Sequence, residues 1–175
     1  KLDEIMQHGC SLSDNCAAGD RLSFLMAQSS AWGGQPPQDA TYLFVTPKGN
    51  DGTTPHSLTA KDVPILGDGF FSVTVYNKSG YLSGPGPYNF NDKTARENAD
   101  GSVTFNFGNC SDPKRLNCMH IEQGWNYIVR LYRPSEAVWK DRTYSFPEAK
   151  PDDYVGSSSQ GRGEEGQTAA EQLSI

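Results

Sequence analysis

Short apolar runs rich in Val, Thr, Phe and Tyr follow one another through residues 40–149, and segments containing glycine or proline separate them. In the clearest case Val103, Phe105 and Phe107 alternate with polar residues, which gives a β-strand one apolar face. Five strands are predicted, at residues 40–46, 56–60, 70–76, 102–107 and 125–132. Because no long helical segment separates them, parallel βαβ units are disfavoured. We expect an all-β fold, an antiparallel β-sandwich of jelly-roll type.

Three aspartates in this region are each followed by glycine, namely Asp51, Asp68 and Asp100. Asp-Gly pairs are typical of tight turns, so we interpret all three as turn residues rather than as catalytic carboxylates. The remaining acidic residues show no pairing of the kind that glycoside hydrolysis requires. The acidic residues therefore indicate turns more strongly than they indicate a catalytic site.

The two ends of the chain differ from this β-rich middle. Leu22, Leu25 and Met26 recur at helical spacing after Asp20, a residue suited to capping a helix, and this pattern predicts one N-terminal helix over residues 20–30. A short helical turn is also expected after Pro134. We therefore divide the chain into an N-terminal extension with a disulfide loop and a helix, a β-sandwich domain and a polar C-terminal tail. These are residues 1–34, 35–151 and 152–175.

The C-terminal tail is dominated by Gly, Ser, Gln and Glu, and such a composition has little of its own to hold it in place. We expect the tail to dock on its own domain or on a neighbouring copy. The expected partners are therefore copies of this chain or another extracellular protein, contacted through the termini.

The charge balance and hydropathy exclude some classes of partner. The net charge is −6 and the pI is about 5.0, so the chain lacks the basic surface expected of proteins that bind nucleic acid. No run approaches the 18 or so apolar residues that a membrane-spanning helix needs. We expect no nucleic-acid partner and no membrane span.

Four cysteines form two close pairs in loop-like segments, Cys10 with Cys16 and Cys110 with Cys118. Three connectivities are open to four cysteines, and we favour pairing within each loop over a zinc site, because the spacings do not match zinc motifs. We expect neither a metal nor a cofactor. Disulfides indicate an oxidising compartment, and we expect a secreted or extracellular protein, periplasmic if the source is bacterial.

Two sequons suit a secreted glycoprotein. They begin at Asn77 and Asn109, each at a predicted turn where a glycan could be attached. Sequons of this kind are common by chance, so they add little beyond the cysteines.

Motifs for nucleophilic catalysis are weak. No Gly-x-Ser-x-Gly element is present, and a serine triad using His56 or His120 as base has no pattern to support it. We interpret His56 as a surface or edge histidine. We expect His120, which follows the second cysteine loop, to form a capping hydrogen bond there.

Aromatic residues are more numerous than a modest core requires, and secreted β-sandwiches often stack sugar rings on exposed aromatic side chains. The candidate ligand contacts are Trp32, Tyr81 and Tyr88, the last two on a Gly-Pro loop. For Arg130 and Arg133 we expect a buried structural ion pair or a carbonyl cap rather than anion recognition.

Four segments taken together resemble the family called Domain of Unknown Function 1214, in the expected order over roughly residues 35–151. They are residues 69–81, 94–107, 124–134 and 143–151. A Cys pair ahead of Gly124 resembles an exported subgroup and supports pairing Cys110 with Cys118. One departure is Phe71, where family members more often carry tryptophan.

The resemblance implies a jelly-roll β-sandwich, often found C-terminal to a second domain of unknown function, numbered 1254, which this sequence lacks. The family has no agreed activity, so no catalytic residues carry over. We therefore expect a secreted, disulfide-stabilised, non-catalytic binding or structural module that contacts glycans or takes part in an extracellular assembly. The alternatives are a hydrolase with a site at the end or in the cavity of the sandwich, and a C-terminal fragment of a larger exported protein.

Overall fold

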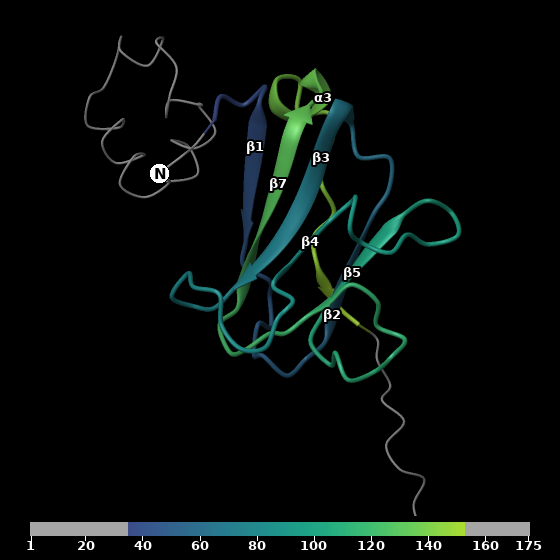
Figure 1. Cartoon of the computed structure of the whole chain (residues 1–175). Helices are drawn as coiled ribbons and strands as arrows, with labels where there is room; N and C mark the ends of the chain where they lie inside the picture. Colours follow the sequence, from purple (N-terminus) through teal and green to yellow (C-terminus); the bar gives the residue numbers. More distant parts are fainter. Residues whose placement is uncertain (1–34, 153–175) are drawn as a thin grey trace, which may run out of the picture.

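A computed structural model describes residues 35–152, which form two four-stranded sheets around one core (Figure 1). The first sheet has the strand order β1-β7-β3-β4 and the second β6-β5-β2-β8. Neighbouring strands are antiparallel except for the short β5–β6 pair, which is parallel. The strands are β1 Ala40–Val45, β2 His56–Ala60, β3 Ile65–Tyr76, β4 Asn89–Asn91, β5 Val103–Phe107, β6 Cys118–Met119, β7 Asn126–Pro134 and β8 Lys150–Pro151. Within residues 35–152 the one helix is α3, Glu136–Trp139.

The strand predictions compare well with this arrangement. All five predicted strands are confirmed as β1, β2, β3, β5 and β7, and the helical turn after Pro134 is confirmed as α3. The predicted helix over 20–30 lies outside the described residues. One turn assignment was wrong: Asp68 lies inside β3, where the pairing with β7 is irregular between Ile65 and Phe70. The irregularity accommodates Gly67 and Gly69, so the strand continues past them.

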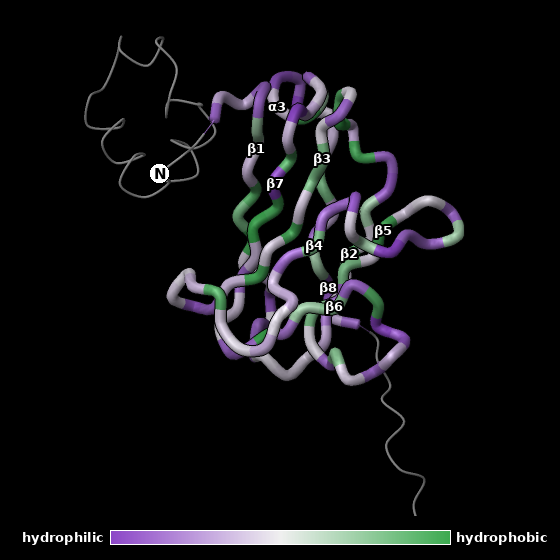
Figure 2. Tube along the Cα trace, in the orientation of Figure 1, coloured by the Kyte–Doolittle hydropathy of each residue, from purple (hydrophilic) through white to green (hydrophobic). Residues whose placement is uncertain are grey.

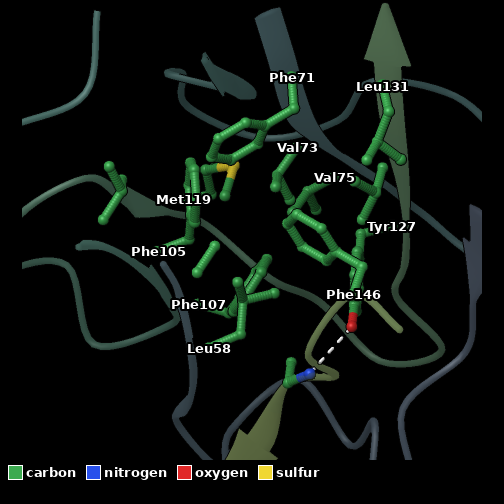
Figure 3. Packing of buried hydrophobic residues seen from close by; sticks show 14 of the residues in the cluster. Leu58, Phe71, Val73, Val75, Phe105, Phe107, Met119, Tyr127, Leu131 and Phe146 are labelled. Carbon is green, nitrogen blue, oxygen red and sulfur yellow. Dashed lines mark hydrogen bonds between the residues drawn. The ribbon is translucent and has the colours of Figure 1, made fainter. Parts of the chain in front are cut away.

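The core lies between the two sheets and is built from alternating residues of the central strands. On β7, Tyr127, Val129 and Leu131 point inward, and Phe105 and Phe107 of β5 meet them from the second sheet (Figure 3). Figure 2 shows hydrophobic residues along β1, β7 and β3 of the first sheet. The apolar set that alternation predicted as inward therefore forms the buried face.

Two of the Asp-Gly turns form as predicted. The Asp51 carboxylate accepts hydrogen bonds from the main-chain N–H groups of Thr53 and Thr54, at 2.8 and 2.7 Å. These bonds hold the pKa of the Asp51 carboxyl well below its usual value. Hydrogen bonds from Ser102, first from its hydroxyl and then from its N–H, lower the pKa of Asp100 to about 2.

The second cysteine loop carries the expected disulfide. Cys110 and Cys118 are bonded, with their Cα atoms 5.5 Å apart. The proposed partners Cys10 and Cys16 lie outside the described residues. No helix within residues 35–152 has the length and apolar character needed to cross a membrane.

Candidate binding face

The outer face of the first sheet carries side chains that the core does not use. The strand register aligns them in rows across the sheet: Phe70 opposite Tyr132, Tyr42 opposite Arg130, and Phe44 opposite Ile128. These residues alternate with the inward set, so they lie on the opposite face of the sheet. We call this the aromatic face and define it by Tyr42, Phe44, Phe70, Tyr76, Arg130 and Tyr132.

The rings of the aromatic face are partly accessible. Phe70 and Tyr132 stack with centroids 4.5 Å apart and an interplanar angle of 28°. Phe44, on the edge strand β1, is 46% exposed, whereas Tyr42, Phe70, Tyr76 and Tyr132 are half-buried. A sheet face with several half-exposed rings offers a flat apolar surface that the fold itself leaves uncovered within residues 35–152.

Arg130 is the charged group of the aromatic face. Its guanidinium donates to the Thr74 hydroxyl at 3.0 Å and to the Tyr76 hydroxyl at 2.7 Å. The guanidinium carbon also lies 5.9 Å from the centroid of the Tyr76 ring, within reach of a cation–π contact. The side chain therefore leans along β3 toward Tyr76 and is held by neutral groups.

Within residues 35–152 neither arginine forms the expected buried ion pair or carbonyl cap. Arg133 forms an exposed ion pair with Asp68. Among the described residues Arg130 forms neither an ion pair nor a bond to a main-chain carbonyl. For Arg130 the reason is that the register places hydroxyl and aromatic groups, and no carboxylate of residues 35–152, within its reach.

Burial raises the pKa of the Tyr42 hydroxyl, and the neighbouring Tyr132 acts in the same direction while the Arg130 cation opposes both. These influences place the two tyrosine hydroxyls and the guanidinium in one electrostatic neighbourhood. Polar side chains of the adjacent strands, Asn89 and Asn91, lie in the same rows. The aromatic face thus combines ring surface, hydroxyl groups and one cation.

The predicted ligand contacts lie elsewhere. Tyr81 projects from the loop after β3 and is 71% exposed. Tyr88 is half-buried, and its hydroxyl donates to the main-chain oxygen of Gly84 at 2.6 Å, which closes the Gly-Pro loop on itself. Trp32 lies outside the described residues. Tyr81 and Tyr88 lie in the loop between β3 and β4, outside the paired strands of the aromatic face, and their contact with ligand stays a prediction.

His56 is not a surface histidine, and that interpretation was wrong. It is fully buried, because it shares the inward side of β2 with Leu58 and Ala60. Its Nδ1 lies 2.8 Å from the Thr54 carbonyl oxygen and its Nε2 3.2 Å from that of Lys48. Each ring nitrogen thus faces a main-chain carbonyl oxygen, and a neutral ring donates to one of the two; within residues 35–152 neither nitrogen contacts a serine or an acid that a catalytic base would need.

His120 lines a small cavity of about 170 Å³ together with Ser83 and Glu122. The Ser83 hydroxyl donates directly to the Glu122 carboxylate at 2.9 Å. Within residues 35–152 His120 forms no hydrogen bond, so the capping role expected for it is not seen, and no histidine links the serine to the acid. This arrangement lacks the base that a serine triad needs.

A larger cavity of about 500 Å³ opens under the edge strand β1, against the segment that follows α3. Burial raises the pKa of Tyr144 on its wall. Its floor is the edge of the core and includes Leu43, Val45, Val129, Leu131, Val138 and Phe146. The cavity has ligand-sized volume, but no histidine of the described residues lines it to act as the base of a serine triad. No group of three or more His, Cys, Asp or Glu residues within 35–152 could hold a metal ion.

The two sequons differ in their surroundings. The Asn77 side-chain oxygen accepts from the N–H groups of Ser79 and Tyr81, both at 3.0 Å, and so builds the turn after β3. Asn109 is exposed at the cysteine loop, with φ of +53°. Both asparagines thus lie at turns, as expected, and their glycosylation stays a prediction.

Sequence reasoning missed the aromatic face as a unit. The signal was present in the run after Trp125, where Ile128, Arg130 and Tyr132 alternate with the inward set. A solvent-facing set with this composition is unusually apolar for the outside of a sheet. Its extent becomes visible only when the register adds residues from β1 and β3.

A family model described as a protein of unknown function, DUF1214, matches residues 46–136, which is about half of the chain. No curated protein matches. Among solved structures, the VPA0106 protein from Vibrio parahaemolyticus has 22% sequence identity and a TM-score of 0.62, over 87% of this chain and 42% of that one. An uncharacterized protein from Burkholderia cenocepacia has 13% identity and a TM-score of 0.42, over 91% of this chain and 49% of that one. The chain thus spans less than half of either structure, and the likeness to the Vibrio protein shows a common fold.

Proposed function

Since the chain belongs to the DUF1214 family, which is described as being of unknown function, we propose a function from the chain's own residues. It is a secreted, disulfide-stabilised, non-catalytic module with a jelly-roll β-sandwich, and it binds saccharides on the aromatic face. The single observation that carries this proposal is the row of partly exposed rings on a sheet face opposite the core.

The composition of the aromatic face suits sugar rings. Saccharides have apolar ring faces edged with hydroxyl groups, so their binding sites combine flat aromatic surface with hydrogen-bonding groups at the margin. Here Phe44 and Tyr132 supply ring surface, and Asn89 and Asn91 of β4 end the rows that begin at Phe44 and Tyr42. The rows are about 7 Å apart along the strands, so the face can contact more than one sugar unit.

Secretion is supported by the disulfide between Cys110 and Cys118. Disulfides form and persist mainly in oxidising compartments. The proposed place of action is therefore extracellular, or periplasmic if the source is bacterial.

A hydrolase at the cavities is the weaker proposal. His56 is occupied by main-chain carbonyls, and Ser83 bonds to Glu122 without a histidine between them. If the chain were a hydrolase at this site, replacing Ser83 or Glu122 would abolish its turnover of a chromogenic ester or glycoside. We expect no such turnover by the wild-type chain.

The saccharide proposal is tested with an oligosaccharide array, followed by calorimetric titration of the oligosaccharides that bind. Phe44→Ala and Tyr132→Ala should each weaken binding by about 3- to 10-fold, because each removes one stacking surface. Phe44 is exposed on an edge strand, so its replacement should leave the fold intact.

Tyr81→Ala serves as the matched control, since Tyr81 is an exposed tyrosine in the loop after β3 and is not part of the cross-strand rows of the aromatic face. Its binding should equal that of the wild type. Loss of binding in Tyr81→Ala alone would move the site to the Gly-Pro loop. An array without any bound oligosaccharide would overturn the proposal, and self-association in light scattering that Phe44→Ala abolishes would assign the face to contact between copies.

A further inference from the structure

The aromatic face has a charge that neutral sugars do not require. Arg130 is half-buried in the middle of the sheet, on the strand that lies between β1 and β3. A partly buried cation is costly unless an anion or a full set of acceptors surrounds it. The surroundings of Arg130 therefore bear on which ligand the face selects.

The hydrogen bonds of Arg130 leave part of its guanidinium unused. A guanidinium has five N–H groups, and Arg130 directs one to the Thr74 hydroxyl and one to the Tyr76 hydroxyl. Within residues 35–152 it forms no other side-chain hydrogen bond. The remaining N–H groups are available to a ligand, and the neighbours already hold the side chain in one orientation.

The aromatic face also has no counter-charge of its own. The residues in its cross-strand rows include Ser72, Thr74, Asn89, Asn91 and Asn126, and none is acidic. The chain as a whole carries a net charge of −6, so any affinity for an anion has to arise locally. Arg130 is placed to provide it.

We propose that the aromatic face selects acidic saccharides, with Arg130 binding the carboxylate of a uronic acid unit while the neighbouring rings stack on the sugar. This inference rests on the proposed function and names its substrate class. A carboxylate matches the planar fork of a guanidinium, and such charge-assisted bonds are stronger than bonds between neutral groups. Binding would give Arg130 the anion that the described residues do not supply.

The test uses calorimetric titration of the full chain with three trimers: galacturonic acid, neutral galactose and sulfated galactose. The wild type should bind the galacturonic acid trimer at least about 10-fold more tightly than the neutral trimer. Arg130→Gln should abolish this preference, because binding of the galacturonic acid trimer should weaken at least about 10-fold more than binding of the neutral trimer. Arg130→Lys should keep only part of the preference, because an ammonium group lacks the fork geometry.

Arg133→Gln is the matched control. Arg133 lies on the same strand but is exposed and paired with Asp68, so its loss should not change the preference. Equal wild-type affinity for the acidic and neutral trimers would overturn this inference and leave saccharide binding standing. Binding of none of the trimers, with an empty array, would overturn the proposed function itself. Tighter binding of the sulfated trimer would overturn the assignment to a carboxylate.

Discussion

Arg115 and Arg130 show two uses of an arginine in one fold. The Arg115 side chain is 8% exposed and pairs with the Asp152 carboxylate. It also donates to the main-chain oxygens of His56 at 2.8 Å and Gly108 at 2.9 Å. Arg130 is half-buried, bonds two hydroxyl groups, and forms no ion pair within residues 35–152. The described residues surround the first cation with acceptors, whereas they hold the second in place without a matching negative charge.

This difference separates stability from recognition. Arg115 links the cysteine loop to β2 and β5, and Asp152 in turn accepts from the Ser57 hydroxyl at 2.6 Å. Its bonds therefore connect elements that are distant in sequence. Arg130 joins only neighbouring strands that already share a backbone ladder. The comparison predicts that Arg115 supports the fold and that Arg130 can be changed without harm to it.

The largest expected effect is that of Arg115→Ala. Removal of the guanidinium leaves the Asp152 carboxylate and several main-chain oxygens without their partner, and we expect a loss of about 3–5 kcal/mol in the free energy of unfolding. Urea denaturation measures it, with Arg115→Lys as the control that keeps the charge and loses the fork. A loss below about 1 kcal/mol for Arg115→Ala would remove the distinction between the two arginines.

A smaller effect on stability should come from Tyr127. Like the Arg115 side chain it is buried, whereas the tyrosines of the aromatic face, like Arg130, are half-buried. Tyr127 is fully buried, and its hydroxyl accepts a hydrogen bond from the Ala149 N–H at 2.9 Å (Figure 3). Burial, with help from Glu148, raises the pKa of the Tyr127 hydroxyl from 10.0 to about 12 despite that hydrogen bond.

The unfolded chain therefore loses the Tyr127 proton near pH 10, while the folded chain keeps it to about pH 12. Stability should fall as pH rises across this window, by at most about 3 kcal/mol from this group. Tyr127→Phe should lose about 1–3 kcal/mol at pH 7, because the Ala149 N–H stays buried without an acceptor. The melting temperature of this variant should also fall less steeply than that of the wild type as pH rises from about 10 to about 12. Equal slopes of melting temperature against pH in the two proteins would show that Tyr127 does not cause the alkaline loss of stability.

Much of the fold could be predicted because alternation in sequence reflects one-sided burial. The strands found in the sequence have at least five residues, whereas the three that were missed, β4, β6 and β8, have only two or three residues and so carry no period. His56 was misinterpreted although its alternation with Leu58 and Ala60 carried the signal for burial. Main-chain carbonyl oxygens lie beside both ring nitrogens of His56, so its polar ring can be buried although polarity alone predicts exposure.

The candidate site could not be predicted in the same way, because it depends on pairing between strands. The sequence places Arg130 and Tyr132 on one side of β7, but only the register brings Tyr42 and Phe70 beside them. The absence of a carboxylate within reach of Arg130 is likewise a property of neighbouring strands. Local patterns therefore indicate which residues face outward and not which of them meet.

The smallest expected effect completes the comparison, and it concerns Arg130 itself. Arg130→Gln should change the free energy of unfolding by no more than about 0.5 kcal/mol, because the Thr74 and Tyr76 hydroxyls can bond water on an open face and no buried anion is left behind. Arg133→Gln, which breaks only an exposed ion pair with Asp68, should have a similarly small effect. Parallel urea denaturation of the two variants makes the measurement. A loss above about 2 kcal/mol for Arg130→Gln alone would mean that the guanidinium is needed to hold β3 and β7 together, and its place on the aromatic face would then reflect structure rather than ligand selection.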